Sequence, residues 1–242
     1  MPPEGIALLP KEEYMSAVEI ERLVKALAAS GVWRIRLTGG EPLLRDDVVS
    51  LVERLSQVEG VRDMALTTNG ERLPDIVEDL RQAGLMRVNI SLDSLDPQRF
   101  EKITLSKSFA KVKESIWRSL DCGLSVKINV VVMRGISDEE IDGFARLAFT
   151  NDLEVRFIEF MPLCGTGWKP DLTLPIEHVR SRIKAQYRLE TLPRGSEVAE
   201  AYSIFGGKGR VGFIASMTEP FCSTCSRIRI SATGKIQLCL FS

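Results

Sequence analysis

The sequence predicts an α/β fold with five parallel strands, followed by a smaller antiparallel extension. Amphipathic helical segments alternate with short strand-like segments at a spacing of about 25–35 residues, which is typical of a parallel sheet or barrel. After Met161 this alternation stops, and residues 187–242 are rich in glycine and short strands. We therefore expect a (β/α) region over residues 1–162 and an extension over residues 163–242.

The predicted helices have local boundary signals. Ser16 and Glu19 form a capping-box pattern before the first helix, and Gly31 follows its end. Ser137 and Glu140 repeat the pattern before a helix that starts at about Ile141. Apolar residues at helical spacing predict further helices over residues 48–60, 76–84, 109–123 and 175–186.

Five strands are predicted over residues 33–38, 64–68, 88–92, 126–132 and 155–160. Because side chains alternate along a strand, each strand has one apolar face and one face that carries polar groups. The residues on this second face are Arg36 and Thr38, Thr67 and Asn69, Asn89 and Ser91, Lys127 and Asn129, and Glu159 and Met161. Because a complete eight-stranded barrel fills its interior with apolar residues, the pattern favours a wide, incomplete barrel around a polar ligand. The alternative is an open sheet whose polar face meets water.

The extension is predicted to contain strands over residues 202–205, 211–215, 228–231 and 236–240, with a turn at residues 206–209. The turn is glycine-rich but lacks the strand–loop–helix context of a phosphate-binding loop, so we interpret it as a hairpin.

Gly39, Gly40 and Glu41 directly follow the first predicted strand. Paired glycines allow a ligand to approach the backbone closely, and the Glu41 carboxylate could bind a ligand ammonium group. The pattern alone is compatible with a simple turn. Its position at the end of a strand with a polar face favours a binding loop.

Cys222, Cys225 and Cys239 follow a C-x2-C-x13-C pattern. This spacing favours a metal or iron–sulfur site with three thiolates, which leaves one position open for a substrate. A disulfide and unrelated buried thiols are the alternatives. Arg227 and Arg229 share a strand face next to this pattern, which suggests an anionic ligand such as a phosphate.

The bulk composition gives no sign of a nucleic acid-binding or membrane protein. The chain has 242 residues and a net charge of −1, so charge gives no indication of nucleic acid or membrane binding. No apolar run approaches the roughly 20 residues of a membrane span. With an odd number of cysteines at uneven spacings, we expect a reducing compartment, the cytoplasm, or the mitochondrial matrix in a eukaryote.

Several segments resemble, in order, the radical S-adenosylmethionine (SAM) GTP 3′,8-cyclases of molybdenum cofactor biosynthesis. The matching segments are residues 35–43, 67–70, 89–94, 126–129, 156–162, 221–229 and 238–241. The resemblance implies a TIM-like (β/α) barrel of the radical SAM type, with five of its six strands present in this chain. It also implies conversion of GTP to (8S)-3′,8-cyclo-7,8-dihydroguanosine 5′-triphosphate, the precursor of cyclic pyranopterin monophosphate.

The resemblance also assigns ligands. It implies a [4Fe–4S] cluster on Cys222, Cys225 and Cys239, and a second, N-terminal cluster that cleaves SAM. The GTP contacts that it implies are Arg36, Thr67, Lys127, Arg227, Ile228 and Arg229. The SAM contacts are Gly40, Ser91 and Met161, to which we add Glu41 from its place in the binding loop. The implied partners are GTP and a downstream cyclic pyranopterin monophosphate synthase, and a homodimer is left open.

One departure from the family is large. The C-x3-C-x2-C motif of the radical cluster does not occur in this sequence, and Cys122 and Cys164 do not match it. We therefore expect a chain shortened at both ends that generates no radical by itself. The alternative is a non-catalytic paralogue that binds a nucleotide or zinc. Cys122 is expected to be a buried structural thiol, whereas Cys164 and His178 receive no role.

Overall fold

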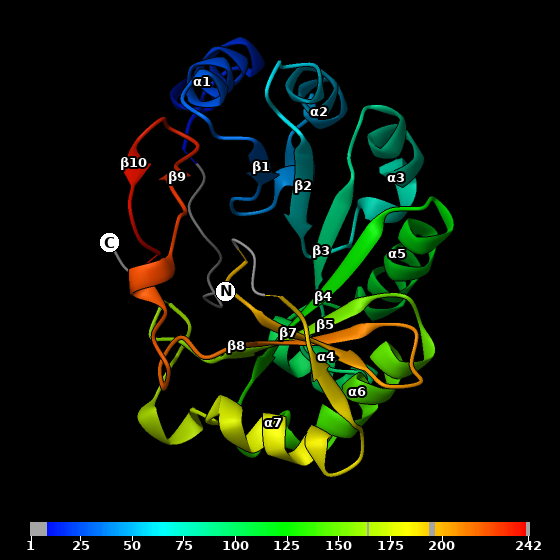
Figure 1. Ribbon diagram of the computed structural model, residues 1–242. Coiled ribbons are helices and arrows are strands. Elements are labelled where there is room, and N and C mark those ends of the chain that lie inside the picture. The colour runs from blue at the N-terminus through cyan, green and yellow to red at the C-terminus, as the bar shows by residue number, and fades with distance from the viewer. Residues whose placement is uncertain (1–8, 164, 194–196, 241–242) are drawn as a thin grey trace. The chain divides into compact units, whose positions relative to one another are not determined.

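The computed structural model describes residues 9–163, 165–193 and 197–240 of the chain (Figure 1). They belong to two compact units. The first unit contains Ser91–Phe109 and Lys127–Ser226, and the second lies within Ala7–Ile90, Ala110–Val126 and Arg227–Ser242.

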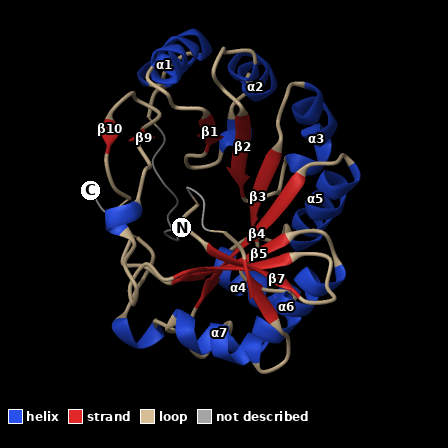
Figure 2. Cartoon of the chain, viewed as in Figure 1, coloured by secondary structure: helices blue, strands red, loops and turns tan. Residues whose placement is uncertain are grey.

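The second unit contains three parallel strands in the order β1-β2-β3. The strands are β1 (Arg34–Leu37), β2 (Asp63–Thr68) and β3 (Arg87–Ser91). The helices of this unit are α1 (Ala17–Ala29), α2 (Val48–Ser56), α3 (Leu73–Gln82) and α5 (Phe109–Asp121), with 3-10 turns η1 (Lys11–Glu13) and η2 (Pro42–Leu44). A short antiparallel pair, β9 (Arg229–Ile230) and β10 (Ile236–Gln237), completes it (Figure 2).

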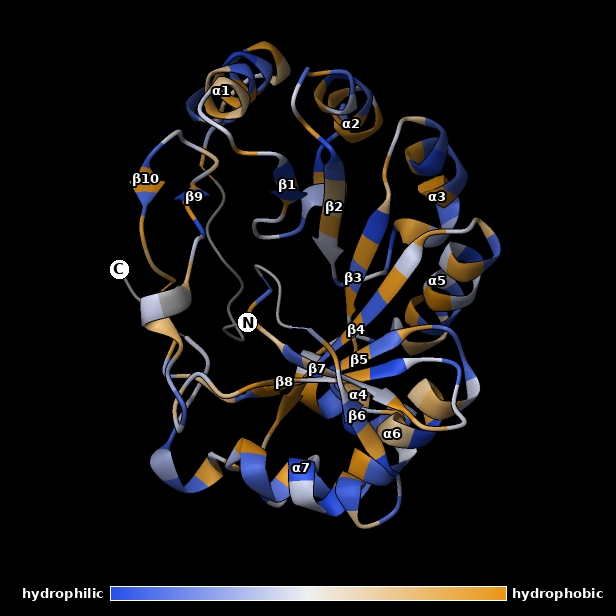
Figure 3. Cartoon of the chain, viewed as in Figure 1, coloured by the Kyte–Doolittle hydropathy of each residue, from blue (hydrophilic) through white to orange (hydrophobic). Residues whose placement is uncertain are grey.

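Local sequence explains why the helices of this unit form where they do. The predicted capping box before α1 is confirmed, because the Glu19 N–H donates to Ser16 Oγ at 3.3 Å and the Ser16 N–H donates to Glu19 Oε2 at 2.8 Å. Apolar and polar positions are interleaved along α3 and α5 (Figure 3). Val77 and Leu80 of α3 are completely buried, and each such side chain contributes about 1.5–3 kcal/mol to folding.

The first unit contains strands in the order β4-β5-β8-β7-β6. The strands β4 (Ser125–Val132), β5 (Glu154–Glu159) and β8 (Arg210–Ile214) are parallel, and β7 (Glu200–Ile204) and β6 (Leu189–Thr191) continue antiparallel. The helices are α4 (Pro97–Thr104), α6 (Ile141–Thr150) and α7 (Ile176–Lys184), with 3-10 turns η3 (Asp138–Glu140), η4 (Pro170–Leu172) and η5 (Cys222–Thr224).

The core of the first unit lies between β5, β8 and the helices α6 and α7, which pack on one face of the sheet (Figure 1). Phe157 on β5 is its centre. Its ring stacks on Phe213 at a centroid distance of 6.0 Å and meets Phe144 edge-on at 6.4 Å. All three rings are almost completely buried. This packing fixes the face of β5 that is turned away from the helices.

The predicted α/β architecture and all five parallel strands are confirmed, with boundaries that shift by no more than one residue. The C-terminal strands differ from expectation. Antiparallel strands are present, but β8 pairs parallel with β5 and extends the same sheet, because Val211 and Phe213 provide an apolar face that continues the core. The strand β6 and the helix α4 were not predicted. On α4 only Phe100 is buried, so apolar periodicity carried no signal there.

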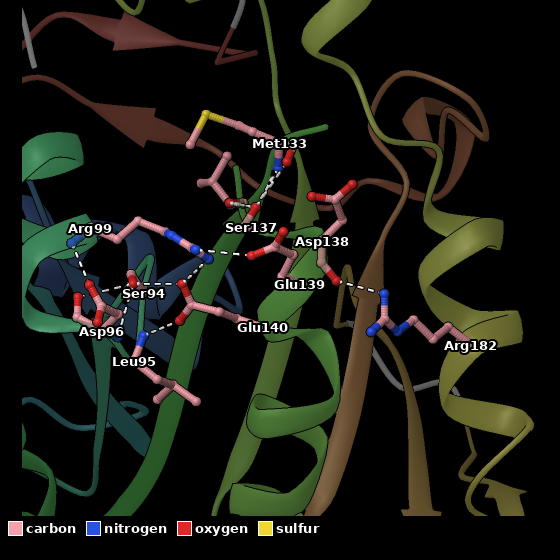
Figure 4. A network of polar contacts seen from close by, with 11 residues as sticks. Ser94, Leu95, Asp96, Arg99, Met133, Ser137, Asp138, Glu139, Glu140 and Arg182 are labelled. Carbon is pink, nitrogen blue, oxygen red and sulfur yellow. Dashed lines mark hydrogen bonds and ion pairs between the residues drawn. The ribbon is translucent and has the colours of Figure 1, made fainter. Parts of the chain in front are cut away.

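The second predicted capping box is wrong. Ser137 does not cap α6, because its hydroxyl accepts a hydrogen bond of 2.6 Å from the Met133 N–H. The Glu140 carboxylate instead accepts hydrogen bonds from Ser94 Oγ at 2.8 Å, from Arg99 Nη1 at 2.7 Å and from the Leu95 N–H (Figure 4). Glu140 therefore fastens the turn that follows β3 to the start of α6.

Within the described part of the chain, no helix has both the length and the apolar character that crossing a bilayer requires.

Candidate functional site

The loop after β1 is held in place by Glu41. Its carboxylate accepts hydrogen bonds from the Leu43 N–H at 3.0 Å, from Thr68 Oγ1 at 2.7 Å and from the Asn69 N–H at 2.8 Å. These contacts join the loop to the end of β2. A Cβ atom added at Gly40 would have no described atom within 4 Å, so the backbone here is open to a ligand. The contact of Glu41 with a ligand ammonium stays a prediction.

A polar surface follows the strands of the second unit, as the alternation predicted. The residues Thr67 and Asn89 are paired in register, and Asn89 Nδ2 donates to Thr67 Oγ1 at 2.9 Å. Arg36 on β1 is paired with Ala65, two residues before Thr67, and is exposed. Arg36, Thr67 and Asn89 therefore lie on one face of this sheet.

The first unit contains a compact cluster of buried charges, made by Lys127, Glu154, Arg156 and Glu197. Lys127 Nζ lies 3.0 Å from Glu154 Oε2, and Arg156 Nε donates to Glu154 Oε1 at 2.5 Å. Glu197 binds both cations, through Lys127 Nζ at 3.0 Å and through Arg156 Nη2. Lys127, Glu154 and Arg156 are each less than a tenth exposed. Two cations and two carboxylates therefore neutralise each other in a largely dry position.

The strand register assembles this cluster. Lys127 of β4 pairs with Glu154 of β5, and Asn129 of β4 pairs with Arg156 of β5. Lys127, Glu154 and Arg156 therefore share one face of the sheet. Gly212 on β8 is the neighbour of Arg156. A Cβ atom there would lie 3.2 Å from Glu154 Oε1 and 3.3 Å from Arg156 Cγ, which is tighter than ordinary contact. The glycine provides the space that these two long side chains need.

Burial and mutual interaction change the proton affinity of the cluster. Burial and the charge of Arg156 lower the pKa of Lys127 below its ordinary value, although Glu154 and Glu197 act in the opposite direction. Burial raises the pKa of Glu154, but the charges of Arg156 and Lys127 outweigh it and keep that pKa below its ordinary value. An anion that replaced one of the carboxylates would meet a preformed cationic pair.

The assignment of Glu159 to the polar face is wrong. Glu159 is completely buried, and Arg156 takes the polar face of β5 in its place. The Glu159 carboxylate accepts hydrogen bonds from the N–H groups of Ile176 at 2.9 Å, Met217 at 2.7 Å and Thr218 at 2.9 Å, and from Thr218 Oγ1. Sequence reasoning missed Arg156 as a site residue. An arginine two residues after Glu154 on a buried strand was the available signal.

Residues at the ends of β3 and β5 complete the first unit's candidate set. Ser91 ends β3 and is part-exposed, as is Met161 just beyond β5. Asp93 accepts a hydrogen bond of 2.9 Å from the Val131 N–H. Part of the residue remains exposed, but burial of its carboxyl group raises the pKa of Asp93 to about 6, against the lowering effect of that hydrogen bond. Asp93 is thus a titratable group at the carboxyl end of β3, where the sequence predicts the rim of the site.

Two cysteines of the predicted cluster site lie on one tight turn. Cys222 begins η5, Cys225 follows it, and the Cys225 N–H donates to the Cys222 carbonyl at 3.2 Å. Both are free thiols with exposed side chains. This turn could supply two of the three thiolate ligands of the predicted site. The described residues hold no group of three His, Cys, Asp or Glu side chains placed to bind a metal, so the third ligand remains a prediction.

The remaining predicted residues belong to the second unit or have no site role. Arg227, Ile228, Arg229 and part-exposed Cys239 lie around β9 and β10 in the second unit. Cys122 follows α5 and is part-exposed, so its predicted burial is wrong. His178 is exposed on α7, and Cys164 falls outside the described residues.

Two family models match the chain. The model of the radical SAM superfamily matches residues 5–148, and the model named Molybdenum Cofactor Synthesis C matches residues 153–242. Together these matches extend over both structural units.

Individual relatives agree with these matches. The chain is 44% identical over 246 residues to the GTP 3′,8-cyclase of Thermodesulfovibrio yellowstonii, covering all of this chain and 76% of that protein. It is 44% identical over 244 residues to molybdenum cofactor biosynthesis protein 1 of Bos taurus, and 43% identical over 244 residues to that of Homo sapiens. Those two matches also cover the whole chain, which spans 38% of the length of each mammalian protein.

Solved structures with low sequence identity share the fold. Streptococcus suis SuiB bound to S-adenosylmethionine aligns over 93% of this chain and 53% of its own, with a TM-score of 0.67 and 17% identity. Methylornithine synthase aligns over 70% of this chain and 52% of its own, with a TM-score of 0.57 and 21% identity. At these identities the likeness concerns the fold alone.

Proposed function

Because the chain belongs to the radical SAM family of GTP 3′,8-cyclases, we propose that it binds GTP for conversion to (8S)-3′,8-cyclo-7,8-dihydroguanosine 5′-triphosphate. This reaction would place it in molybdenum cofactor biosynthesis, where a downstream synthase of cyclic pyranopterin monophosphate would use the product. The finer fold proposal is an incomplete TIM-like barrel whose polar face meets the nucleotide.

The buried pair of Lys127 and Arg156 is the observation that carries the proposal. A nucleoside triphosphate has several negative charges, and guanidinium and ammonium groups bind phosphate oxygens through charge-assisted hydrogen bonds. Each such bond contributes about 1.5–3 kcal/mol. Lys127 is also one of the residues that the family resemblance assigns to GTP. Arg36, Thr67, Arg227, Ile228 and Arg229 are the further proposed GTP contacts.

The proposed cofactor contacts divide between two groups of residues. Cys222, Cys225 and Cys239 would hold a [4Fe–4S] cluster through their thiolates. Gly40, Glu41, Ser91 and Met161 would line the SAM site, with the open backbone at Gly40 admitting the ligand. The cluster on these three thiolates would bind the nucleotide, whereas the radical chemistry of this family would come from SAM and the N-terminal cluster. The protein residues position the two ligands and neutralise the triphosphate.

Equilibrium binding of GTP tests the proposal. We expect Lys127→Ala to weaken GTP binding by about tenfold or more, since one charge-assisted contact is lost. The matched control is Lys208→Ala, which removes an exposed lysine of the same unit and should bind as the parent chain does. Circular dichroism verifies that both variants fold. Unchanged GTP affinity in folded Lys127→Ala would contradict the proposal.

A second candidate is a non-catalytic protein that binds zinc or a nucleotide. The exposed thiols of Cys222 and Cys225 on one turn are compatible with zinc as well as with iron. Metal analysis after anaerobic purification separates the two. Iron and sulfide in the protein favour the cyclase, whereas zinc with no acid-labile sulfide favours the second candidate.

A further inference from the structure

The two carboxylates of the buried charge cluster are held in different ways. Glu154 lies within β5, beside Lys127 in register, and its side chain is 8% exposed. Glu197 comes from the chain between β6 and β7, and its side chain is 26% exposed. Glu154 is therefore a fixed part of the sheet. Glu197 reaches the cluster from its solvent-accessible side.

Glu197 binds the two cations in the way that a phosphate group would. Its Oε1 and Oε2 lie 3.1 Å and 3.0 Å from Lys127 Nζ, and Oε2 also accepts a hydrogen bond from Arg156 Nη2. A carboxylate and a phosphate both present paired anionic oxygens to such donors. Glu154 alone would leave the pair with one uncompensated positive charge, so a second anion in this position restores the charge balance.

We propose that Glu197 is an internal competitor of the substrate, occupying the Lys127–Arg156 pair until a phosphate group of the nucleotide replaces it. The inference rests on the proposed function, in which Lys127 contacts GTP. It goes further by assigning to Glu197 a role in setting the affinity for the triphosphate. While Glu197 is in place, the cationic pair is neutralised and the buried cluster keeps its charge balance. Each binding event must separate the Glu197 carboxylate from both cations, which weakens the observed affinity.

The variant Glu197→Gln isolates this effect. The amide keeps the size and shape of the side chain but lacks the negative charge. We expect GTP and inorganic tripolyphosphate to bind about tenfold or more tightly to Glu197→Gln than to the parent chain, since a charge-assisted contact no longer has to be broken. Glu190→Gln is the matched control, because Glu190 is an exposed glutamate on β6 of the same unit. Its affinities should equal those of the parent chain.

The variant Glu197→Asp separates the loss of negative charge from a change in folding caused by substitution at this position. The shorter side chain keeps the charge, so it should bind both anions less tightly than Glu197→Gln does. Thermal unfolding with and without tripolyphosphate shows which variants are folded. Reductive methylation of Lys127, quantified by mass spectrometry, shows directly whether an anion covers the Lys127 ammonium group. Tripolyphosphate should protect Lys127 at lower concentration in Glu197→Gln than in the parent chain.

The two probes separate the inference from the proposed function. Tighter binding of both probes to Glu197→Gln supports both. Tighter binding of tripolyphosphate without any binding of GTP supports the internal competitor and contradicts GTP as the substrate. GTP binding that is equal or weaker in folded Glu197→Gln overturns the competitor and leaves the proposed function standing. Absence of binding of either probe to all variants overturns both.

Discussion

The completely buried carboxylate of Glu159 accepts a hydrogen bond of 2.9 Å from the backbone N–H of Ile176, the first residue of α7. The same carboxylate accepts hydrogen bonds from the N–H groups of Met217 and Thr218. One side chain at the end of β5 thus satisfies backbone donors from two distant segments. The second segment leads directly to the turn of Cys222 and Cys225, so Glu159 connects the end of the central strand to the proposed cluster ligands.

Replacing Glu159 with Gln should destabilise the first unit by about 2–4 kcal/mol. The amide NH2 group would face backbone donors, and the charge that strengthens these hydrogen bonds would be lost. Urea unfolding followed by circular dichroism measures the change in the free energy of unfolding. Glu59→Gln, at an exposed glutamate, is the control and should stay within about 0.5 kcal/mol of the parent chain. A loss for Glu159→Gln no larger than for the control would show that the tether adds no stability.

Gly212→Ala should destabilise the fold by about 1–3 kcal/mol, since overpacking forces buried neighbours to shift. Its Cβ would meet Glu154 Oε1 at 3.2 Å and Ala199 Cβ at 3.3 Å, and these groups lie inside a packed sheet. The same denaturant titration measures this effect. If stability is unchanged, the cluster of Lys127 and Arg156 adapts more easily than its close packing indicates.

Gly40→Ala should leave stability almost unchanged, unlike Gly212→Ala, and should clearly weaken SAM binding. A methyl group at Gly40 finds open space among the described residues, so the folded chain should tolerate it within about 0.5 kcal/mol. The methyl group would obstruct the close approach of a ligand to the backbone. Equilibrium binding of SAM, measured beside thermal unfolding, checks both parts. Full SAM affinity in the variant would remove Gly40 from the proposed site.

Asp93 should make stability depend on pH. Its pKa is raised from the ordinary 3.8 to about 6 in the folded chain, so folding favours the protonated carboxyl group. The stabilisation is therefore complete below about pH 3.8 and is lost as the pH rises through about 6. A shift of this size corresponds to about 2–3 kcal/mol.

The variant Asp93→Asn tests this linkage. The amide oxygen can still accept the hydrogen bond from the Val131 N–H, but the side chain cannot ionise. We expect the variant to be more stable than the parent chain at pH 7.5, with an advantage that shrinks as the pH falls to about 4. Asp152→Asn, at an exposed position, should show no such trend. An advantage that is the same at every pH would exclude Asp93 as the titrating group.

Local signals in the sequence predicted the elements better than the contacts among them. The capping box of Ser16 and Glu19 formed because both partners lie within one turn of helix. The equivalent pattern at Ser137 and Glu140 failed because Arg99 and the turn after β3 offer Glu140 stronger partners. No local pattern reports such tertiary competition.

The same limit applies to the candidate site. Alternation correctly placed Thr67 and Lys127 on polar faces, since it depends only on the strand itself. It missed the pairing of Lys127 with Glu154, which is set by the register between β4 and β5. The space at Gly212 and the approach of Glu197 depend on chain segments more than forty residues away from Arg156 or Lys127. Such contacts follow from the assembled sheet, and single-strand periodicity carries no information about them.

The final prediction concerns the thiolates. Reconstituted anaerobically with iron and sulfide, the chain should bind a cluster whose iron content falls in each of Cys222→Ser, Cys225→Ser and Cys239→Ser, because a serine oxygen is a poor ligand for iron in this setting. The short turn joining Cys222 to Cys225 makes these two losses similar in size. Cys122→Ser is the control, since Cys122 follows α5 and is absent from the proposed ligand set. Iron and acid-labile sulfide per chain, together with the visible absorption of the cluster, are the measurements. Equal iron content in Cys239→Ser and the parent chain would refute the third ligand, and loss of iron in Cys122→Ser would relocate the site.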